Sequence, residues 1–288
     1  MIGGSLALDL RRRGFATRII GVESNEMHAA RALEAGIVDE VDTLGNMVAK
    51  AGLIILACPI DSIKRLLPML LDMVGGSSKT ITDMGSTKAG MCRLVSDHPN
   101  RMHYVAAHPM AGTEHSGPSA AVLNLFDHKC TIICDAEKSG RNALATVLSM
   151  FRALNMKPVY MDAEEHDVSA AYVSHISHIS SFALSLCVLN KERNHKRILS
   201  LAGGGFASTV RLAKSEASTW VPVFEQNASN VLEVLDTYIE TLQTFRKHIE
   251  EQNHNGIRGM ILEANEIKKI LKEKPIHENG NNPTGGSH

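Results

Sequence analysis

The chain has 288 residues, a length that predicts two domains, each large enough to bury a core of its own. Lys and Arg together number 30, Asp and Glu 31, and the longest run of like charge is Arg11 to Arg13, which excludes an extended surface for nucleic acid or anionic membrane. The five cysteines form no C-x-x-C pair or disulfide framework, and we find neither a cleavable leader nor a long apolar run, so we expect a cytoplasmic protein that acts on a small molecule.

Short β-branched runs alternate with helical patterns over residues 1–162. This alternation is typical of a Rossmann-type, doubly wound and mostly parallel α/β sheet. Strands are predicted for 18–23, 53–59, 80–85, 103–109, 130–135 and 158–162, and amphipathic crossover helices for 26–36, 60–73, 88–98 and 140–155.

The strand pattern ends after Asp162, and long helical patterns follow, which predicts an all-helical second domain over 163–272. Regularly spaced apolar residues over 231–249 exceed what a lone helical bundle of this size needs, so we expect one face to pack on a second copy as a homodimer. The polar segment 273–288, rich in Gly, Asn and Pro, is predicted to be a disordered tail.

Two glycines and one acidic residue have the spacing of half a dinucleotide-binding unit. Gly3 and Gly4 open an apolar helix, and Glu23 lies 20 residues after Gly3 at the end of the next strand. Such a helix N-terminus binds pyrophosphate, and an acidic side chain binds the ribose diol while repelling the 2′-phosphate of NADP, which favours NAD. The alternative is an ordinary loop before a helix. The unit's first strand would precede Met1, so we expect either that the sequence starts late within a longer gene or that a truncation leaves a gap between two unpaired strand edges.

Two polar motifs follow predicted strands at the same edge of the sheet, where doubly wound folds bind ligands. DMGSTKAG (83–90) contributes Ser86, and HPMAGTEHSG (108–117) contributes His108. An imidazole with a pKa near neutrality suits a base that activates a hydroxyl. The alternatives are a helix N-cap at Thr87 and a structural role for His108.

The helical half contributes a second group of polar residues. Ser174 and His178 are four residues apart and share one helix face. A zinc site at His175 and His178 is disfavoured, because no cysteine or carboxylate has matching spacing. Arg211 follows a glycine turn and suits a bidentate clamp for a carboxylate. The alternatives are a polar stripe on a buried helix for the histidines and a surface salt bridge for Arg211.

Together these segments resemble the TyrA family of prephenate, arogenate and cyclohexadienyl dehydrogenases, from Ile2 to about Leu271. The matching segments occur in the order GGSLAL, an acidic end to the second strand, LACP, DMGSTK, HPMAGTEHSG, SHISH and GGGFASTVRLA. The resemblance implies a Rossmann-type domain followed by a helical dimerisation domain. It also implies oxidative decarboxylation of prephenate to 4-hydroxyphenylpyruvate with hydride transfer to NAD, in tyrosine biosynthesis, with arogenate as the alternative substrate.

The resemblance also implies roles for individual residues. His108 would be the catalytic histidine that accepts a hydrogen bond from the ring 4-hydroxyl, with Ser86 beside it at the nicotinamide, and Arg211 would bind a substrate carboxylate. The further residues that it implies for the substrate pocket are His178, Ser174, Thr113, Glu114 and Ser116. Those that it implies for the cofactor site are Gly3, Gly4, Glu23, Cys58, Pro59, Asp83 and Ser86.

The chain departs from the family pattern at three places. The first strand is absent, Ser177 stands in place of the usual proline, and Ser208 stands in place of an acidic residue. The first departure allows a rival interpretation, a non-catalytic dimeric module that has lost its cofactor strand. A second rival, a small hydroxyacid or pyrroline-type reductase, would need a catalytic lysine that VSAAYVSHISHISSF lacks.

Overall fold

The computed structural model describes residues 1–194 and 197–272, so the predicted tail 273–288 lies outside the described residues. The chain forms two compact units, Met1–Val234 and a second that begins at Leu235. The predicted domain boundary between residues 162 and 163 lies inside the first unit, so it stays a prediction.

The first unit is built on a five-stranded sheet in the order β3-β4-β5-β6-β7. β3, β4 and β5 are parallel, β6 is antiparallel to β5, and β7 is parallel to β6. The strands span β3 (Leu53–Leu56), β4 (Thr80–Asp83), β5 (Tyr104–Pro109), β6 (Cys130–Cys134) and β7 (Lys157–Met161). No α-helix joins β5 to β6, and an antiparallel pair needs none, whereas a parallel pair requires a crossover. The predicted mostly parallel α/β fold is confirmed.

A separate two-stranded sheet pairs β1 (Ile20–Gly21) with β2 (Glu40–Val41) in parallel. β2 was not predicted, because two residues between turns carry no alternation pattern. Within the described residues β1 pairs only with β2 and β3 only with β4, so a gap separates the two-stranded sheet from the five-stranded sheet. In the described part of the chain, β1 and β3, the strands on either side of this gap, each have one unpaired edge.

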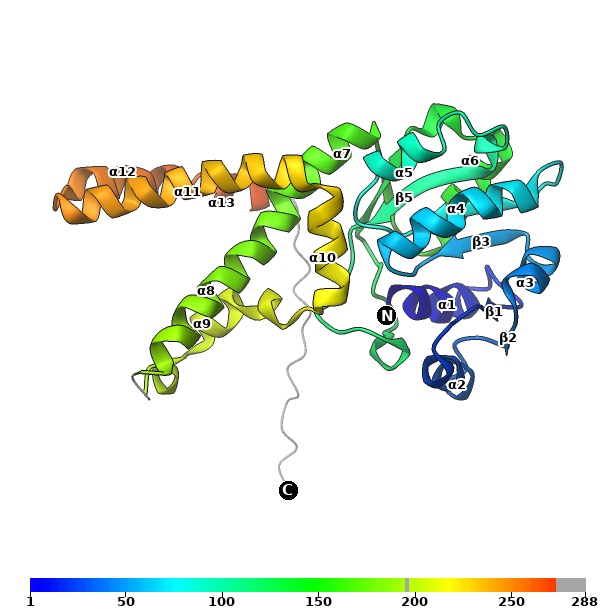
Figure 1. Cartoon of the computed structure of the whole chain (residues 1–288), viewed down its shortest axis with the longest axis horizontal. Helices are drawn as coiled ribbons and strands as arrows, with labels where there is room; N and C mark the ends of the chain where they lie inside the picture. Colours follow the sequence, from blue (N-terminus) through cyan, green and yellow to red (C-terminus); the bar gives the residue numbers. More distant parts are fainter. Residues whose placement is uncertain (195–196, 273–288) are drawn as a thin grey trace, which may run out of the picture. The chain divides into compact units, whose positions relative to one another are not determined.

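Helices cover both faces of the larger sheet (Figure 1). Their spans are α1 (Ile2–Arg12), α2 (Glu26–Glu34), α3 (Leu44–Lys50), α4 (Ile60–Val74), α5 (Ala89–Leu94) and α6 (Arg141–Ala153). Alternate residues of β5 enter opposite cores, since Tyr104 packs with α4 and α5 and Val105 packs with α1 and α6. Leu67 of α4 and Val147 of α6 are fully buried. Each such side chain contributes about 1.5–3 kcal/mol, so both layers hold the sheet edge that carries the polar motifs.

The rest of the described chain is helical, as predicted. α7 (Ala163–Ala170) continues through a π-helical turn (Ala171–His175) into α8 (Ile176–Glu192), and α9 (Gly204–Thr209) and α10 (Ala217–Gln226) follow. α11 (Ala228–Glu250) begins in the first unit, and the second unit contains the remainder of α11 with α12 (His254–Ala264) and α13 (Ile267–Lys272). Gly204 and Gly205, which belong to the predicted glycine turn before Arg211, form the first turn of α9. The π-helical turn, which was not predicted, is a feature that often marks functional sites.

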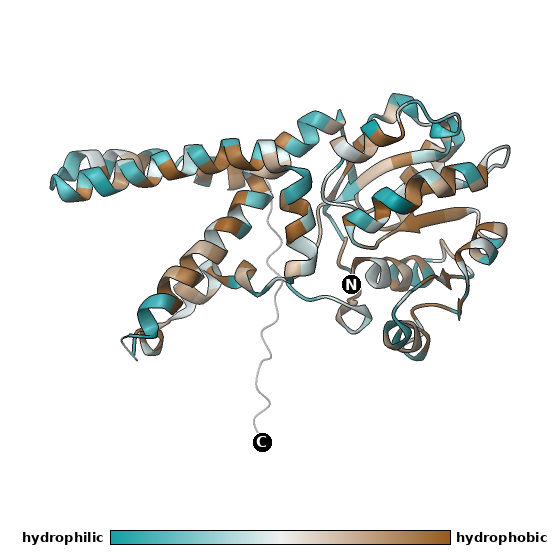
Figure 2. Ribbon diagram, viewed as in Figure 1, coloured by the Kyte–Doolittle hydropathy of each residue, from teal (hydrophilic) through white to brown (hydrophobic). Residues whose placement is uncertain are grey.

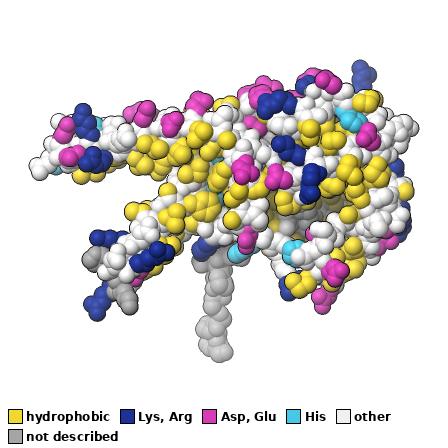
Figure 3. Space-filling model, viewed as in Figure 1, with side chains coloured by type: hydrophobic (Ala, Val, Ile, Leu, Met, Phe, Trp, Pro, Cys, Tyr) yellow, Lys and Arg dark blue, Asp and Glu magenta, His cyan; other side chains and the backbone are white. Residues whose placement is uncertain are grey.

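The helical segment Ala163–Glu192 contains many apolar residues (Figure 2), and several of their side chains are exposed (Figure 3). By length and composition alone it could cross a membrane, although core helices of soluble proteins meet the same criterion. Leu186 is 60% exposed and Leu189 47% exposed. A contiguous exposed patch of this kind marks an interaction surface. The predictions of a homodimer and of no membrane partner remain predictions at this stage.

Candidate functional site

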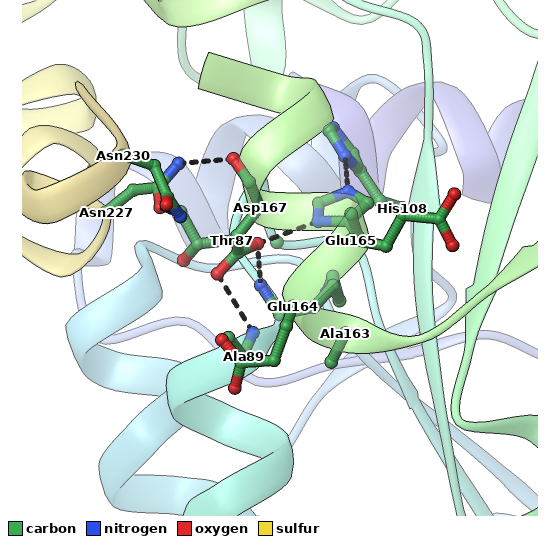
Figure 4. Close-up of polar contacts among 12 residues, drawn as sticks. Thr87, Ala89, His108, Ala163, Glu164, Glu165, Asp167, Asn227 and Asn230 are labelled. Carbon is green, nitrogen blue, oxygen red and sulfur yellow. Dashed lines mark hydrogen bonds and ion pairs between the residues drawn. The ribbon is translucent and has the colours of Figure 1, made fainter. Parts of the chain in front are cut away.

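His108, the penultimate residue of β5, begins a chain of three polar side chains. Its Nδ1 lies 2.8 Å from Nε2 of His166 in α7, and Nδ1 of His166 lies 2.8 Å from Oδ1 of Asp167 (Figure 4). His166 and Asp167 are each 2% exposed, whereas His108 is half-buried. The chain therefore runs from a buried carboxylate to an imidazole at the sheet edge.

Asp167 also joins the two polar motifs. Its Oδ1 accepts the Lys88 N–H at 2.7 Å, and its Oδ2 accepts the Ala89 N–H at 3.0 Å, so it caps the start of α5 (Figure 4). The alternative prediction of a Thr87 cap is wrong, because the Thr87 hydroxyl instead donates to Gln226 at 3.4 Å. Sequence analysis missed Asp167, since an acidic residue on a helix beside a histidine has no local signature for a contact 79 residues away.

The surroundings of His108 favour its neutral form. Burial lowers the pKa of His108 well below its usual value, and His166, Lys88 and His175 act in the same direction, the two imidazoles only when they carry a proton on both nitrogens. A neutral imidazole keeps one nitrogen lone pair, which can accept a proton from a hydroxyl. His108 therefore has the protonation state that a general base requires at neutral pH.

Ser86 and Asp83 lie in the same motif but differ in their surroundings. Ser86 is half-buried between β4 and α5, and its hydroxyl makes no hydrogen bond within the part of the chain that the structure describes, which leaves it available to a ligand. Asp83 is fully buried and forms an ion pair with Lys88. It also accepts the Tyr104 hydroxyl at 2.6 Å and the Gly85 N–H at 2.9 Å. This geometry favours a structural role for Asp83, so its predicted cofactor contact stays a prediction without support.

The predicted residues of α8 and its π-helical turn lie against an aromatic cluster. The ring of His178 stacks on Trp220 with centroids 3.5 Å apart, and its Nδ1 lies 3.0 Å from the Ser174 carbonyl oxygen. His175 is buried, and its Nδ1 lies 3.1 Å from Nδ2 of Asn227. Since Nδ2 of Asn227 also donates to the Asp167 backbone carbonyl at 2.7 Å, this cluster is connected to the polar chain of His108.

Arg211 and Glu114, both predicted to contact substrate, contact each other. Nη1 of Arg211 lies 3.2 Å from Oε2 of Glu114, and the guanidinium side chain is 53% exposed. A backbone hydrogen bond, followed by Arg211, holds the pKa of Glu114 below its usual value. An exposed pair of this kind contributes only about 0–1 kcal/mol, so a ligand carboxylate can displace Glu114. Thr113 lies beside them, and its hydroxyl accepts the His115 N–H at 3.3 Å.

The other predicted cofactor residues lie at the start of α1, after β1 and after β3. α1 has no side-chain cap and no acidic residue in its first turn, so its free N–H groups suit a pyrophosphate. A Cβ on Gly3 would lie 3.0 Å from the Ala57 Cβ, and one on Gly4 would lie 2.9 Å from the Ala121 Cβ, so close packing requires both glycines. Glu23 is exposed, as a ribose ligand must be.

Cys58 and Pro59 follow β3 on the same side of the sheet. Cys58 is half-buried, and burial, together with the negative charges of Asp83 and Glu23, raises the pKa of its thiol. Pro59 is exposed and forms the N-cap position of α4. The proximity of Glu23 to Cys58 brings the predicted adenosine-side residues together, and this arrangement fits NAD.

Comparisons with known proteins agree over almost the whole chain. The model of the prephenate dehydrogenase nucleotide-binding domain matches residues 6–160, and that of the prephenate dehydrogenase dimerisation domain matches residues 162–263. Prephenate dehydrogenase of Bacillus subtilis is 28% identical and covers 97% of this chain and 75% of its own length. Cyclohexadienyl dehydrogenase of Zymomonas mobilis is 30% identical over 84% of this chain and 83% of its own length.

Solved structures of similar proteins also align closely. Prephenate dehydrogenase from Aquifex aeolicus, in complex with hydroxyphenyl propionate and NAD+, is 27% identical with a TM-score of 0.81, covering 94% of each chain. Synechocystis arogenate dehydrogenase is 26% identical with a TM-score of 0.72, covering 94% of this chain and 96% of its own.

Proposed function

The chain belongs to the prephenate dehydrogenase family, and we propose that it converts prephenate to 4-hydroxyphenylpyruvate at the site around His108. Family membership makes it an NAD-dependent oxidoreductase of tyrosine biosynthesis and rules out the rival small-hydroxyacid reductase. The observation that supports the site is the hydrogen-bonded chain that links His108, at the sheet edge that also carries Ser86, through His166 to the buried carboxylate of Asp167. The surroundings of His108 lower its pKa and so favour its neutral form.

The chemistry requires a base, an aligned ring and a departing carboxylate. His108 accepts the proton of the ring 4-hydroxyl while the C4–H bond breaks, and the oxygen electrons close a C4 carbonyl. NAD, when bound, accepts the hydride released from C4. The electron pair of the breaking C1–carboxylate bond flows into the ring, carbon dioxide leaves, and the resulting phenolate recovers the proton from His108. Aromatisation supplies the driving force, so the protein mainly has to position the ring.

We propose that the residues around Arg211 position the substrate. We propose that the Arg211 guanidinium exchanges Glu114 for a substrate carboxylate, which its exposure and the weakness of the exposed pair permit. Ser86 would contact the 4-hydroxyl region beside His108. We propose Ser174, His178 and Thr113 for the side-chain end of the substrate, because His178 and Arg211 are close enough for Arg211 to lower the pKa of the His178 ring.

His178 favours arogenate as a second candidate substrate. Its Nδ1 faces the Ser174 carbonyl oxygen, which only accepts, so Nδ1 carries the hydrogen. Burial lowers the pKa of His178, which leaves Nε2 as a lone-pair acceptor at neutral pH. An acceptor suits the ammonium group of arogenate better than the ketone of prephenate.

We further propose that the enzyme is a cytoplasmic homodimer. The region that matches the dimerisation-domain model contains the exposed apolar residues of α8, which supports self-association. The relatives named above are biosynthetic dehydrogenases, which supports a cytoplasmic location.

The proposal is tested by assaying NAD and NADP, each with prephenate and with arogenate, on the full chain. We expect turnover with NAD. The rate with NADP should be at least about tenfold lower, because Glu23 repels the 2′-phosphate. Titration of the protein with NAD separates this proposal from its rival. Absence of both NAD binding and turnover would establish a non-catalytic dimeric module.

A further inference from the structure

We infer that Asp167 and His166 are positioning residues that hold the His108 ring with its hydrogen on Nδ1 and its lone pair on Nε2. The inference rests on the proposed function, in which His108 is the base. It starts from the contacts Asp167 Oδ1 to His166 Nδ1 and His166 Nε2 to His108 Nδ1, both 2.8 Å long (Figure 4). Both distances lie within the range of strong hydrogen bonds.

The first contact determines which nitrogen of His166 carries a hydrogen. Asp167 accepts the N–H groups of Lys88 and Ala89 at 2.7 Å and 3.0 Å, so both of its oxygens act as acceptors. A carboxylate surrounded by donors must also accept from His166. Nδ1 of His166 therefore carries the hydrogen, and in the neutral ring Nε2 is the acceptor.

The second contact passes this arrangement to His108. Nε2 of His166 has a lone pair to offer, so the hydrogen between the two rings must come from Nδ1 of His108. In neutral His108 the remaining nitrogen, Nε2, then carries the lone pair. Nε2 makes no hydrogen bond within residues 1–194 and 197–272, so it is available to the substrate hydroxyl.

The same contacts assist the step in which His108 becomes positively charged. The charged and titratable groups that face His108 are Lys88 at the start of α5, His166 on α7 and His175 in the π-helical turn, and positive charge on any of them disfavours a positive charge on His108. His166 opposes this effect when it is neutral, because its Nε2 accepts a stronger hydrogen bond from the imidazolium of His108. Asp167 keeps His166 in the form that can do so.

Asp167 has a second, structural task, which the test has to separate from the first. Asp167→Asn would place an amide where the carboxylate now accepts three N–H groups, so it alters the α5 cap as well as the tautomer of His166. His166→Phe retains the ring shape and leaves both backbone contacts of Asp167 intact. Asp162→Asn is the matched control, because Asp162 caps the start of α7, the helix that carries His166 and Asp167, by accepting the Glu165 N–H at 2.7 Å.

Kinetics of these variants test whether Asp167 acts through His166. We expect His166→Phe and Asp167→Asn each to lower kcat by about 10- to 10³-fold, with KM and NAD affinity changed by less than about threefold, and Asp162→Asn to leave all three unchanged. Because Asp167 acts through His166, the double variant should be no slower than His166→Phe alone, within about threefold. Near-normal kcat in His166→Phe, or losses that multiply in the double variant, would overturn the inference.

A spectroscopic measurement reads the tautomer without turnover. Long-range ¹H–¹⁵N spectra of protein labelled in the histidine rings distinguish Nδ1–H from Nε2–H, and the His108 signals are those lost in His108→Gln. We expect Nδ1–H in the unaltered protein and a shift towards Nε2–H in Asp167→Asn. Nε2–H in the unaltered protein would overturn the inference even if the enzyme is active. Nδ1–H in a protein without dehydrogenase activity would support the tautomer and refute the proposed function.

Discussion

His108 is the residue whose substitution tests the proposed chemistry most directly. We expect His108→Asn to lower kcat by about 10²- to 10⁴-fold, because asparagine can occupy the position but cannot accept the hydroxyl proton. NAD affinity should stay within about twofold, since His108 is not among the residues predicted to bind the cofactor. Steady-state kinetics and NAD titration check both expectations. His103→Asn is the control, because that half-buried imidazole contacts the Lys79 carbonyl oxygen and not the site. Near-normal turnover in His108→Asn would refute the assignment.

His178 leads to a prediction about pH and substrate preference. Its pKa is lowered by burial first and further by Arg211, with a partly opposing effect from its bond to the Ser174 carbonyl. The ring is therefore neutral at pH 7 and becomes charged only below its usual range, where Nε2 gains a hydrogen that a ketone can accept. We expect the KM ratio of prephenate to arogenate to fall as the pH decreases through this lower range.

The ratio is the informative quantity, because protonation of His108 affects both substrates equally. His175, the neighbouring imidazole, has a pKa lowered by burial to about 4 and stays neutral over most of the same range. His178→Gln is the matched variant, since glutamine offers both a donor and an acceptor and should remove the pH dependence of the ratio. A ratio that is independent of pH in the unaltered enzyme would contradict a role for His178 at the substrate side chain.

At the scale of the element, α1 combines a packing requirement with cofactor binding. Alanine is favoured over glycine in a helix by about 0.5–1 kcal/mol, but a Cβ on Gly4 would lie 2.9 Å from the Ala121 Cβ. We expect Gly4→Ala to be net destabilising by about 1–3 kcal/mol and to weaken NAD binding, because the helix N-terminus must move. Thermal unfolding and NAD titration measure the two effects.

Gly45 in α3 is the control for this substitution, because a Cβ there would meet nothing within 4 Å. Gly45→Ala should raise the unfolding temperature and leave NAD affinity unchanged. If Gly4→Ala stabilises the protein as Gly45→Ala does, the close approach of α1 to Ala121 is not a constraint.

Most elements of the fold could be predicted because their patterns are local. All six predicted strands are present, since each is a β-branched run bounded by turn signals, whereas the two-residue β2 has no such pattern. His108 and Ser86 could be assigned to one sheet edge because both follow strands. The link between them, through His166 and Asp167, could not be predicted, because it depends on how α7 packs against the start of α5. Sequence patterns alone do not specify contacts between such distant segments.

At the scale of the whole molecule, the exposed side chains of α8 require an explanation. Leu186 is 60% exposed and lies in a region that matches a dimerisation domain, and burial of a leucine contributes about 1.5–3 kcal/mol. We expect Leu186→Glu to shift the protein from dimer to monomer at micromolar concentration, because each interface would then contain unpaired charges. Light scattering after size-exclusion chromatography measures the mass directly.

Leu94→Glu separates an interface effect from a general effect of added charge. Leu94 in α5 is 51% exposed, comparable to Leu186, but belongs to the part of the chain that matches the nucleotide-binding domain. We expect it to leave the mass unchanged. A monomeric mass for the unaltered protein would refute the homodimer and leave the apolar surface of α8 without its proposed partner. An unchanged dimer in Leu186→Glu would instead place the interface on other residues, because two glutamates buried there without partners would cost more than the lost leucines contribute.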